Sequence, residues 1–315
     1  MSETSSLGLA RVHPISSVFD ICTRLSIAEQ VALAFFIYIT LAAFMFHLGA
    51  RDLCIIMMLN TVTLATLMAL RRNRDRAPWL AAAADLFPAL LLLVAYRESG
   101  LLLTPDPTHH LDYVFIQWDR VLLRNQFVRA MLQAGAPWLQ RYLELAYLLC
   151  YPLVPLGVSA VRYAPQRSAA GEPAAARGHR AMDSFWAAVL LATLFCYAVY
   201  PFFPLTPPRL LFGDVPGPPP SADGVLRNWN FWLLDHYSVQ ACIFPSGHVA
   251  AVTAVALAVR KHAPRLGALF LFLAASVALA TIYGRYHYAA DAVAGALVGV
   301  AAYAASNALR PRAIE

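Results

Sequence analysis

Residues 266–308 read LGALFLFLAASVALATIYGRYHYAADAVAGALVGVAAYAASNA, and this stretch decides the class of fold. It contains two apolar runs, 266–283 and 288–308, which are separated only by the short segment 284–287. Spanning the hydrocarbon core of a bilayer takes about 20 mostly apolar residues per helix. The stretch therefore predicts two transmembrane helices that run in opposite directions and share a short polar turn.

The rest of the chain has the same character. Of its 315 residues, 60% are hydrophobic and 13% are charged, whereas soluble domains carry about 25% charged residues. The composition and the apolar runs predict an all-α fold: one integral-membrane domain over 1–315, a polytopic helix bundle with about eight transmembrane helices. The six further runs are 27–48, 53–70, 79–96, 138–161, 184–203 and 245–259.

Basic residues gather in alternate loops and predict the orientation of the bundle. Clusters of Arg and Lys lie within 71–76, 162–180 and 260–265, and cytoplasmic loops are the ones that retain positive charge. Both termini are therefore expected in the cytoplasm, and residues 204–247 and 284–287 are expected on the outer face of the cell (inner) membrane. The same loops explain most of the net charge of +6, so a nucleic-acid partner is not expected.

The pair His287 and Asp291 carries the clearest chemical signal. Four residues apart on a helix, the two side chains share one face, so the carboxylate can accept a hydrogen bond from the imidazole. That arrangement fixes the tautomer and leaves the second ring nitrogen as a nucleophile. The competing interpretation is a polar pair that anchors a helix end. The same stagger continues to Gly295 and Gly299, which predicts close approach of another helix.

A second signal is the sequence Pro245-Ser246-Gly247-His248. Proline suits the first position of a helix, and the free amides that follow it, at Ser246, Gly247 and His248, would form an anion site at the positive end of the helix dipole. His248, when protonated, could act as a general acid. A plain helix cap beside an interfacial histidine is the alternative.

Arg209 and Arg285 belong to the same predicted outer face. Guanidinium groups bind phosphate oxygens in a bidentate manner and stay charged, so both residues are candidate phosphate ligands. The alternative is contact with lipid headgroups at the membrane surface.

Other polar residues are open to more than one interpretation. Residues 112–135 predict an amphipathic helix in the outer interface, which either caps the bundle or helps a lipid to enter. Asp85 is expected to pair with Arg near the cytoplasmic side, and Glu144 lies nearer the outer face, where it is a candidate for substrate contact. A metal site is less favoured than a solvated surface for Asp106, His109, His110 and Asp112.

Together these residues resemble the type 2 phosphatidic acid phosphatase superfamily of membrane lipid phosphatases and phosphotransferases. The match comprises Pro-Ser-Gly-His at 245–248 and His-x3-Asp at 287–291, within a resemblance that covers roughly 184–308. The resemblance implies that His287 is the nucleophile, His248 the general acid and Asp291 the orienting carboxylate, and that no metal or other cofactor is used. It also implies a six-helix catalytic core, placed at 79–308 with its motifs in 204–295, so that the spans within 1–78 are additions.

The chain departs from the family pattern at Phe202 and Thr281, where a lysine and an arginine are usual, and at Leu210, where a proline is usual. These departures resemble the branch that includes fungal inositol phosphorylceramide synthase, which transfers a phosphoryl headgroup between lipids. The leading hypothesis is therefore a metal-independent phosphotransferase that acts on a lipid phosphate among membrane lipids through a phosphohistidine. The alternatives are a phosphatase for phosphatidic acid, phosphatidylglycerol phosphate or polyprenyl diphosphate and, from another class, a transporter or scaffold. The lipid and the oligomeric state are not encoded in these motifs.

Overall fold

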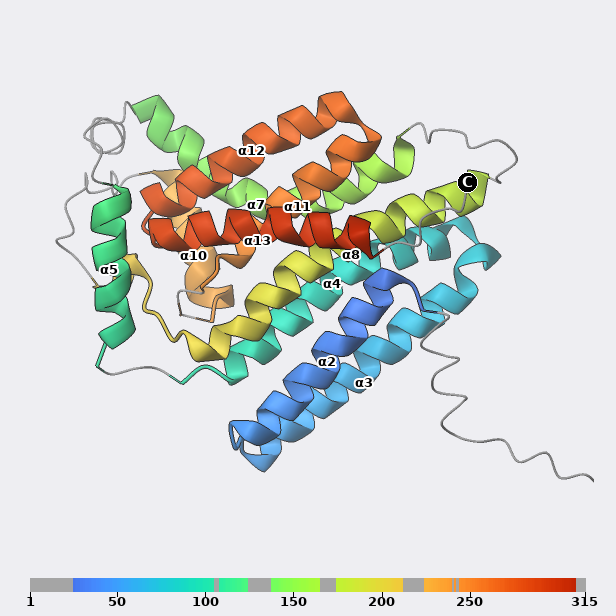
Figure 1. Cartoon of the computed structure of the whole chain (residues 1–315), viewed down its shortest axis with the longest axis horizontal. Helices are drawn as coiled ribbons and strands as arrows, with labels where there is room; N and C mark the ends of the chain where they lie inside the picture. The colour runs from blue at the N-terminus through green and yellow to red at the C-terminus, as the bar shows by residue number, and fades with distance from the viewer. Residues whose placement is uncertain are drawn as a thin grey trace, which may run out of the picture.

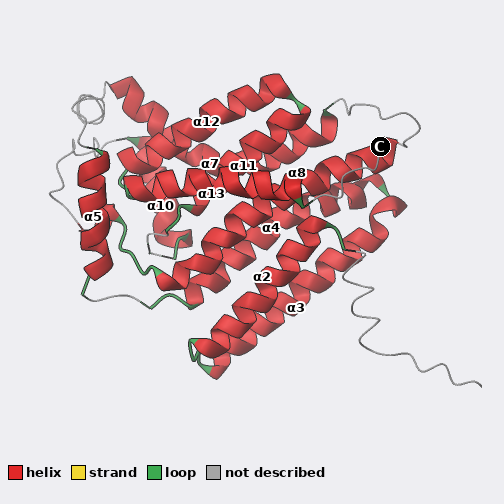
Figure 2. Cartoon of the chain, in the orientation of Figure 1, coloured by secondary structure: helices red, strands yellow, loops and turns green. Residues whose placement is uncertain are grey.

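The computed structural model describes residues 25–104, 108–123, 137–164, 174–211, 224–239, 241 and 244–309. These residues form helices and no strand, which confirms the all-α prediction (Figure 2). The long helices are α2 (Ile27–Met45), α3 (Ala50–Asn73), α4 (Pro78–Leu101), α7 (Pro137–Tyr163), α8 (Ala174–Val199), α11 (Gly247–His262), α12 (Pro264–Tyr283) and α13 (Ala289–Ala308). The short elements are η1 (Arg74–Arg76), α5 (His110–Leu122), η2 (Tyr200–Phe202), α9 (Pro208–Leu211) and α10 (Val225–Tyr237).

Seven of the long helices are long and apolar enough to cross a membrane, so the protein is a multi-pass membrane protein. The remaining long helix, α11, has 16 residues and a length of about 24 Å, which is less than the roughly 30 Å of a hydrocarbon core. Of the two shortest predicted spans, 245–259 is short in the structure as well, whereas 53–70 lies within the 24 residues of α3.

The helices begin where the sequence supplies caps. Ser26 and Glu29 form a capping box at the start of α2, in which each side chain accepts a hydrogen bond from the backbone of the other residue. α4, α7 and α12 each begin with a proline, whose missing N–H costs nothing in the first turn. Tight turns and caps therefore set the ends of the antiparallel helices.

The bundle has two ends, which Figure 1 shows at opposite sides of the molecule. The histidine end is where α8 and α12 finish and α11 and α13 begin. The opposite end is where α2, α4 and α8 begin. α5 runs across the histidine end, roughly perpendicular to α13 (Figure 1). Tyr113, Trp118 and Val121 on α5 are exposed, as an amphipathic helix in an interface requires.

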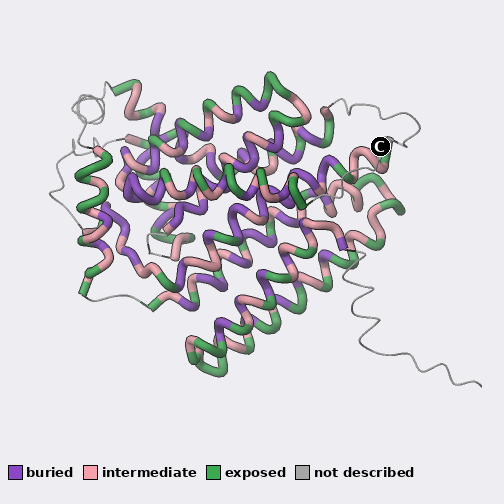
Figure 3. The backbone as a smooth tube through the Cα atoms, viewed as in Figure 1, coloured by how far each residue is buried: buried purple, intermediate pink, exposed green. Residues whose placement is uncertain are grey.

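α8 is the centre of the bundle and packs against α2, α11 and α13. Within its membrane-spanning window 67% of the residues are buried, compared with 22% in α3. Figure 3 shows the same contrast, because the α2–α3 hairpin lies at the edge and presents much exposed surface. Exposed apolar side chains such as Leu41, Met58 and Val62 on the hairpin are suited to contact lipid tails.

α13 approaches α11 closely at two glycines. A Cβ atom added at Gly295 would lie 2.5 Å from the carbonyl oxygen of Ser246, and one added at Gly299 would lie 2.8 Å from that of Ala250. Backbone atoms cannot move aside as a flexible side chain can, so only glycine fits. This confirms the prediction of close helix packing along this stripe.

Two connecting segments contain helical turns. Residues 174–181 belong to the first turns of α8, whose alanines favour a helix. Residues 208–211 form the single turn α9, which begins at a proline. In the predicted amphipathic helix 112–135, residues 124–135 lie outside the described part of the chain.

Candidate active site

His248 and His287 face each other at the histidine end of the bundle. Their ring centroids are 5.8 Å apart, although the whole of helix α12 separates the two residues in the sequence. His287 is 7% exposed. The two imidazoles that the sequence singles out therefore form one site.

Asp291 lies behind His287, with Oδ2 3.4 Å from Nδ1 of the imidazole. The same oxygen accepts a hydrogen bond from the backbone N–H of Tyr288 at 3.2 Å, and the side chain is fully buried. The prediction that His287 and Asp291 pair because they share one face of a helix was wrong. α13 begins at Ala289, so His287 precedes the helix and meets Asp291 through the geometry of its N-terminal cap.

The Pro-Ser-Gly-His segment forms the start of α11, but the backbone N–H of Ser246 is not free as predicted. Ser246 is the N-cap: its hydroxyl accepts from Val249 N at 3.5 Å, and its own N–H donates to the carbonyl oxygen of Asp291 at 3.1 Å. The backbone N–H of Ser246 therefore forms the hydrogen bond that joins the start of α11 to α13. The helix begins at Gly247 rather than at Pro245, which leaves Gly247 and His248 at the N-terminus of the helix dipole.

Gly247 packs closely against two tyrosine side chains, those of Tyr197 and Tyr200. A Cβ atom at this position would lie 2.6 Å from the hydroxyl oxygen of Tyr200. The rings of Tyr147 and Tyr151 each lie 5.8 Å from the ring of His248. The general-acid candidate is thus enclosed by aromatic side chains from α7.

Arg209 and Arg285 are joined through the backbone, because the N–H of Arg209 donates to the carbonyl oxygen of Arg285 at 3.0 Å. Within the described part of the chain, the buried Nη2 of Arg209 has no hydrogen-bond partner. Arg285 has a positive φ of 57°, and burial together with the charge of Arg227 lowers its pKa. Both guanidinium-bearing residues are therefore held beside the turn that carries His287.

A buried polar network that the sequence analysis did not find holds this turn. Glu144 on α7 accepts from Arg227 at 2.6 Å, from Asn230 at 2.6 Å and from the hydroxyl of Tyr286 at 2.7 Å. Burial, followed by the charge of Glu144, raises the pKa of Tyr286. Glu144 thus binds protein groups and positions the residue next to His287. The sequence marked Glu144 as a carboxylate within an apolar run, but it did not indicate which residues this carboxylate binds.

α5 supplies a second support that was not predicted. Asp119 accepts hydrogen bonds from the N–H groups of Ala289 and Ala290, at 3.0 and 3.2 Å, and so caps α13. A carboxylate at a helix N-terminus also complements the dipole. Burial raises the pKa of Asp119 to about 6. The interfacial helix is therefore attached to the helix that carries Asp291.

Asp112, also on α5, is 2% exposed, so the predicted solvated surface is wrong for this residue. It accepts from Thr206 N at 2.8 Å and from the hydroxyl of Tyr288 at 3.2 Å, and it lies 2.9 Å from His109. Among the described residues no group of three or more His, Cys, Asp or Glu is placed to hold a metal ion, and Asp106 lies outside them.

The positions that depart from the family pattern carry no cation. The ring of Phe202 packs against that of Phe46, with centroids 5.8 Å apart. Thr281 is buried, and its carbonyl oxygen accepts from the N–H groups of Tyr286 and His287 at 2.9 and 3.1 Å. The charge of the site therefore depends on Arg209, Arg285 and the neighbouring Arg227.

A comparison with family models finds one match, the PAP2 superfamily, over residues 115–305. This range begins within α5, well before the expected 184. No curated protein and no solved structure gives a significant match. Members of this superfamily are generally phosphatases or phosphotransferases, which supports an enzymatic activity of that type on lipid substrates. Because the match covers more than half of the chain, the protein belongs to the PAP2 superfamily.

Proposed function

We propose that this protein is a membrane lipid phosphotransferase that works through a phosphohistidine on His287. The observation that carries the proposal is the facing pair of imidazoles, 5.8 Å apart, with Asp291 behind one of them. Nothing in such a pair requires a metal, and the proposed steps use none. The family match supports the reaction type, and the geometry supports the roles.

In the first step, Nε2 of His287 attacks the phosphorus of the donor lipid, because Nδ1 faces Asp291. An N–P bond forms, the P–O bond to the leaving group breaks, and His248 gives its proton to the departing alkoxide. Arg209, Arg285 and the amides of Gly247 and His248 stabilise the charge on the equatorial oxygens. Ser246 contributes by joining α11 to α13 rather than by binding phosphate.

In the second step, neutral His248 removes a proton from an acceptor hydroxyl. The acceptor oxygen bonds to phosphorus, the N–P bond breaks, and His287 is regenerated. Two features favour an alcohol of the kind used by inositol phosphorylceramide synthase. One is the set of departures at Phe202, Leu210 and Thr281, and the other is the pair of tyrosine rings beside His248, which leaves that imidazole only partly exposed. With water as the acceptor, the same residues would act as a phosphatase.

The arginine and lysine positions support a topology in which the opposite end faces the cytoplasm and the histidine end faces outward. The segments from Arg71 to Arg76 and from Arg260 to Arg265, where consecutive helices meet, both lie at the opposite end. A cysteine introduced at exposed position 236 is expected to react with a membrane-impermeant maleimide on intact cells. A cysteine introduced at position 261 is expected to react only after lysis, and the reverse pattern would invert the topology.

The decisive experiment uses purified protein in detergent, with a chelator and a panel of lipid phosphates. Inorganic phosphate release and new phospholipid products are followed together. His287→Ala is expected to lower turnover at least ~10³-fold, because no nucleophile remains. His47→Ala, at an exposed residue in the turn after α2, is the matched control and should retain full activity.

A new phospholipid without free phosphate would identify a transferase, and free phosphate alone would identify the phosphatase. An active His287→Ala enzyme would disprove the phosphohistidine. A radiolabelled donor adds a direct check, because the acid-labile protein-bound phosphate should form in wild type and be missing in His287→Ala.

A further inference from the structure

The helix α10 has its polar and apolar faces reversed relative to a helix that faces water. Arg227 and Asn230 are buried, with 6% and 0% of their surface exposed. By contrast, Val225, Trp229 and Trp232 are 71%, 57% and 44% exposed. With about 3.6 residues per turn, the two sets lie on opposite faces of the helix. A surface helix of a soluble protein buries its apolar face, so the exposed face of α10 is suited to surroundings less polar than water.

The polar face of α10 is bound to protein. Arg227 and Asn230 each donate to Glu144 on α7 at 2.6 Å. Leu234, on the same side of the helix, belongs to a buried cluster with residues of α7 and α12. These contacts fix which face of α10 points toward the bundle and which face points away from it.

The same contacts place α10 beside the membrane-spanning helices at the histidine end, where Figure 1 also shows it. Glu144 lies two turns along α7 from Pro137, which corresponds to a depth of about 10 Å. Ala280, which belongs to the same cluster as Leu234, lies one turn before the end of α12. Interfacial helices bury their apolar face by about 5–10 Å at the boundary between headgroups and acyl chains. The depth of α10 is therefore that of an interfacial helix.

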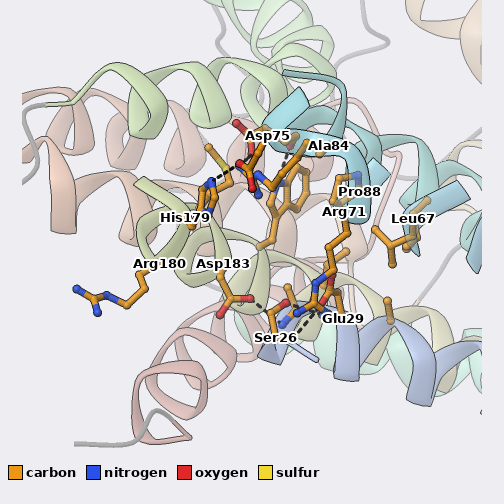
Figure 4. A pocket seen from close by; sticks show the side chains of 18 residues that line it. Ser26, Glu29, Leu67, Arg71, Asp75, Ala84, Pro88, His179, Arg180 and Asp183 are labelled. Atoms are coloured by element: carbon orange, nitrogen blue, oxygen red, sulfur yellow. Dashed lines mark hydrogen bonds and ion pairs between the residues drawn. The ribbon is translucent and has the colours of Figure 1, made fainter. Parts of the chain in front are cut away.

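The charged residues at the opposite end of the bundle have the arrangement that water requires. Glu29, Arg71, Asp75 and His179 surround a cavity there (Figure 4). The side chain of Arg71 is 39% exposed and that of Asp75 is 86% exposed. Charged groups thus reach the surface at that end, whereas α10 turns its arginine inward and its tryptophans outward.

The exposed residues of α10 are of the types that are enriched at membrane interfaces. The rings of Trp229 and Trp232 lie next to each other, with centroids 6.1 Å apart. Tryptophan suits this layer because its ring is apolar and its N–H can still bind water or a headgroup. Asp235 and His236 are exposed in the last turn. These two polar residues hold that end at the level of the headgroups, where water and soluble reagents reach it.

Lipid is the partner that this face fits, because the face continues a surface that lipid covers. Leu145, which directly follows Glu144 on α7, is exposed, and so is Trp138 at the start of the same helix. α7 is long and apolar enough to span the membrane, so its exposed apolar residues are suited to contact lipid. A bilayer that reaches Leu145 also reaches α10, which is bound to the neighbouring residue.

We propose that α10 docks into the leaflet at the histidine end through Val225, Trp229 and Trp232. The partner is phospholipid, contacted where the headgroups meet the acyl chains. One face of the helix then binds lipid and the other binds Glu144. Because Glu144 also accepts from Tyr286, which precedes His287, the docked helix supports the turn that carries this histidine. The docking itself does not depend on the chemistry proposed for the histidines.

The test measures the tryptophan emission of the full chain in nanodiscs of phosphatidylcholine, with or without bromine on the acyl chains. Bromine quenches tryptophan that contacts lipid, and iodide quenches tryptophan that contacts water. The emission of wild type minus that of the double variant Trp229→Phe/Trp232→Phe isolates the two rings of α10. Phenylalanine keeps an aromatic ring at both positions. Trp186→Phe is the matched control, because Trp186 is buried within the bundle.

Brominated lipid is expected to remove most of the α10 emission and little of the Trp186 emission. That loss supports docking whether or not iodide also reaches the rings. Quenching by iodide without quenching by brominated lipid would overturn the proposal, because the face would lie in water. Resistance to both quenchers would also overturn it, because protein such as a second copy of the chain would cover the face. Should the double variant fail to fold, Trp229→Phe and Trp232→Phe give the same difference one ring at a time.

Discussion

Asp291 and Asp85 are buried carboxylates at opposite ends of the same bundle, with 0% and 4% of their surface exposed. Asp85 is surrounded by two guanidinium groups, from Arg74 and Arg162, so its charge is neutralised in place. Asp291 meets an imidazole and the backbone amide of Tyr288, neither of which carries a fixed charge. The partner therefore decides what a buried acid does: Asp85 stabilises the fold, and Asp291 can polarise a nucleophile.

The largest expected effect is that of Asp291→Asn on turnover. The amide cannot stabilise a developing imidazolium, and it permits the wrong tautomer of His287, so kcat should fall by ~10²–10⁴. The thermal unfolding temperature in detergent should change little, because the amide keeps the size and most hydrogen bonds. Unchanged kcat in Asp291→Asn would remove the carboxylate from the mechanism.

Asp85→Asn is the matched substitution at the other end and should have the reverse profile. Removing the charge leaves Arg74 and Arg162 facing each other without a counter-ion, at a cost of about 1–3 kcal/mol of stability, since both arginines retain some access to solvent. Turnover per folded molecule should be unchanged. Denaturation in detergent and a stopped assay measure the two quantities, and a loss of kcat with intact stability would contradict the comparison.

Gly295→Ala and Gly299→Ala sharpen the comparison along one helix. Both add a methyl group against the backbone of α11, at a cost of about 1–3 kcal/mol. The methyl group of Gly295→Ala would meet the backbone of Ser246, which is next to the site. Gly295→Ala should therefore also lower kcat/KM about tenfold. Gly299→Ala, one turn further along the helix, should lower it less. Equal losses of activity would mean that the spacing at Ser246 has no special importance.

The smallest effect concerns Asp119 and pH. Burial raises its pKa from 3.8 to about 6 in the folded state, so the folded protein holds this proton more tightly than the unfolded chain. The contribution of Asp119 to stability should therefore be greatest below pH 4 and decline as the pH rises to about 6. The unfolding temperature of wild type minus that of Asp119→Asn is the measurement, taken across this range. A difference that grows with pH would show that capping by the ionised carboxylate outweighs burial.

The sequence was sufficient for the parts of the molecule that depend on local pattern. Apolar runs of sufficient length identified the long helices, and the spacing of Asp291, Gly295 and Gly299 identified the packing stripe of α13. The arginine pairing of Asp85 followed from the cost of an isolated charge in a membrane helix.

The parts that were missed depend on contacts between distant segments. Asp119 meets Ala289 across 170 residues, and Glu144 meets Tyr286 across 142 residues. No periodicity encodes such a partner. The error at Ser246 has a similar origin, since a helix cap can be identified from one segment but its amide bond to Asp291 depends on a second helix.

The backbone contact at Gly295 and Gly299 has a mechanical consequence. Where two helices touch through side chains, their separation changes with rotamers and with temperature. α11 and α13 instead touch main chain to main chain, so the distance between His248 on α11 and His287, just before α13, is set by incompressible backbone. A thicker or thinner bilayer can tilt the two helices together as one stiff unit without separating the imidazoles.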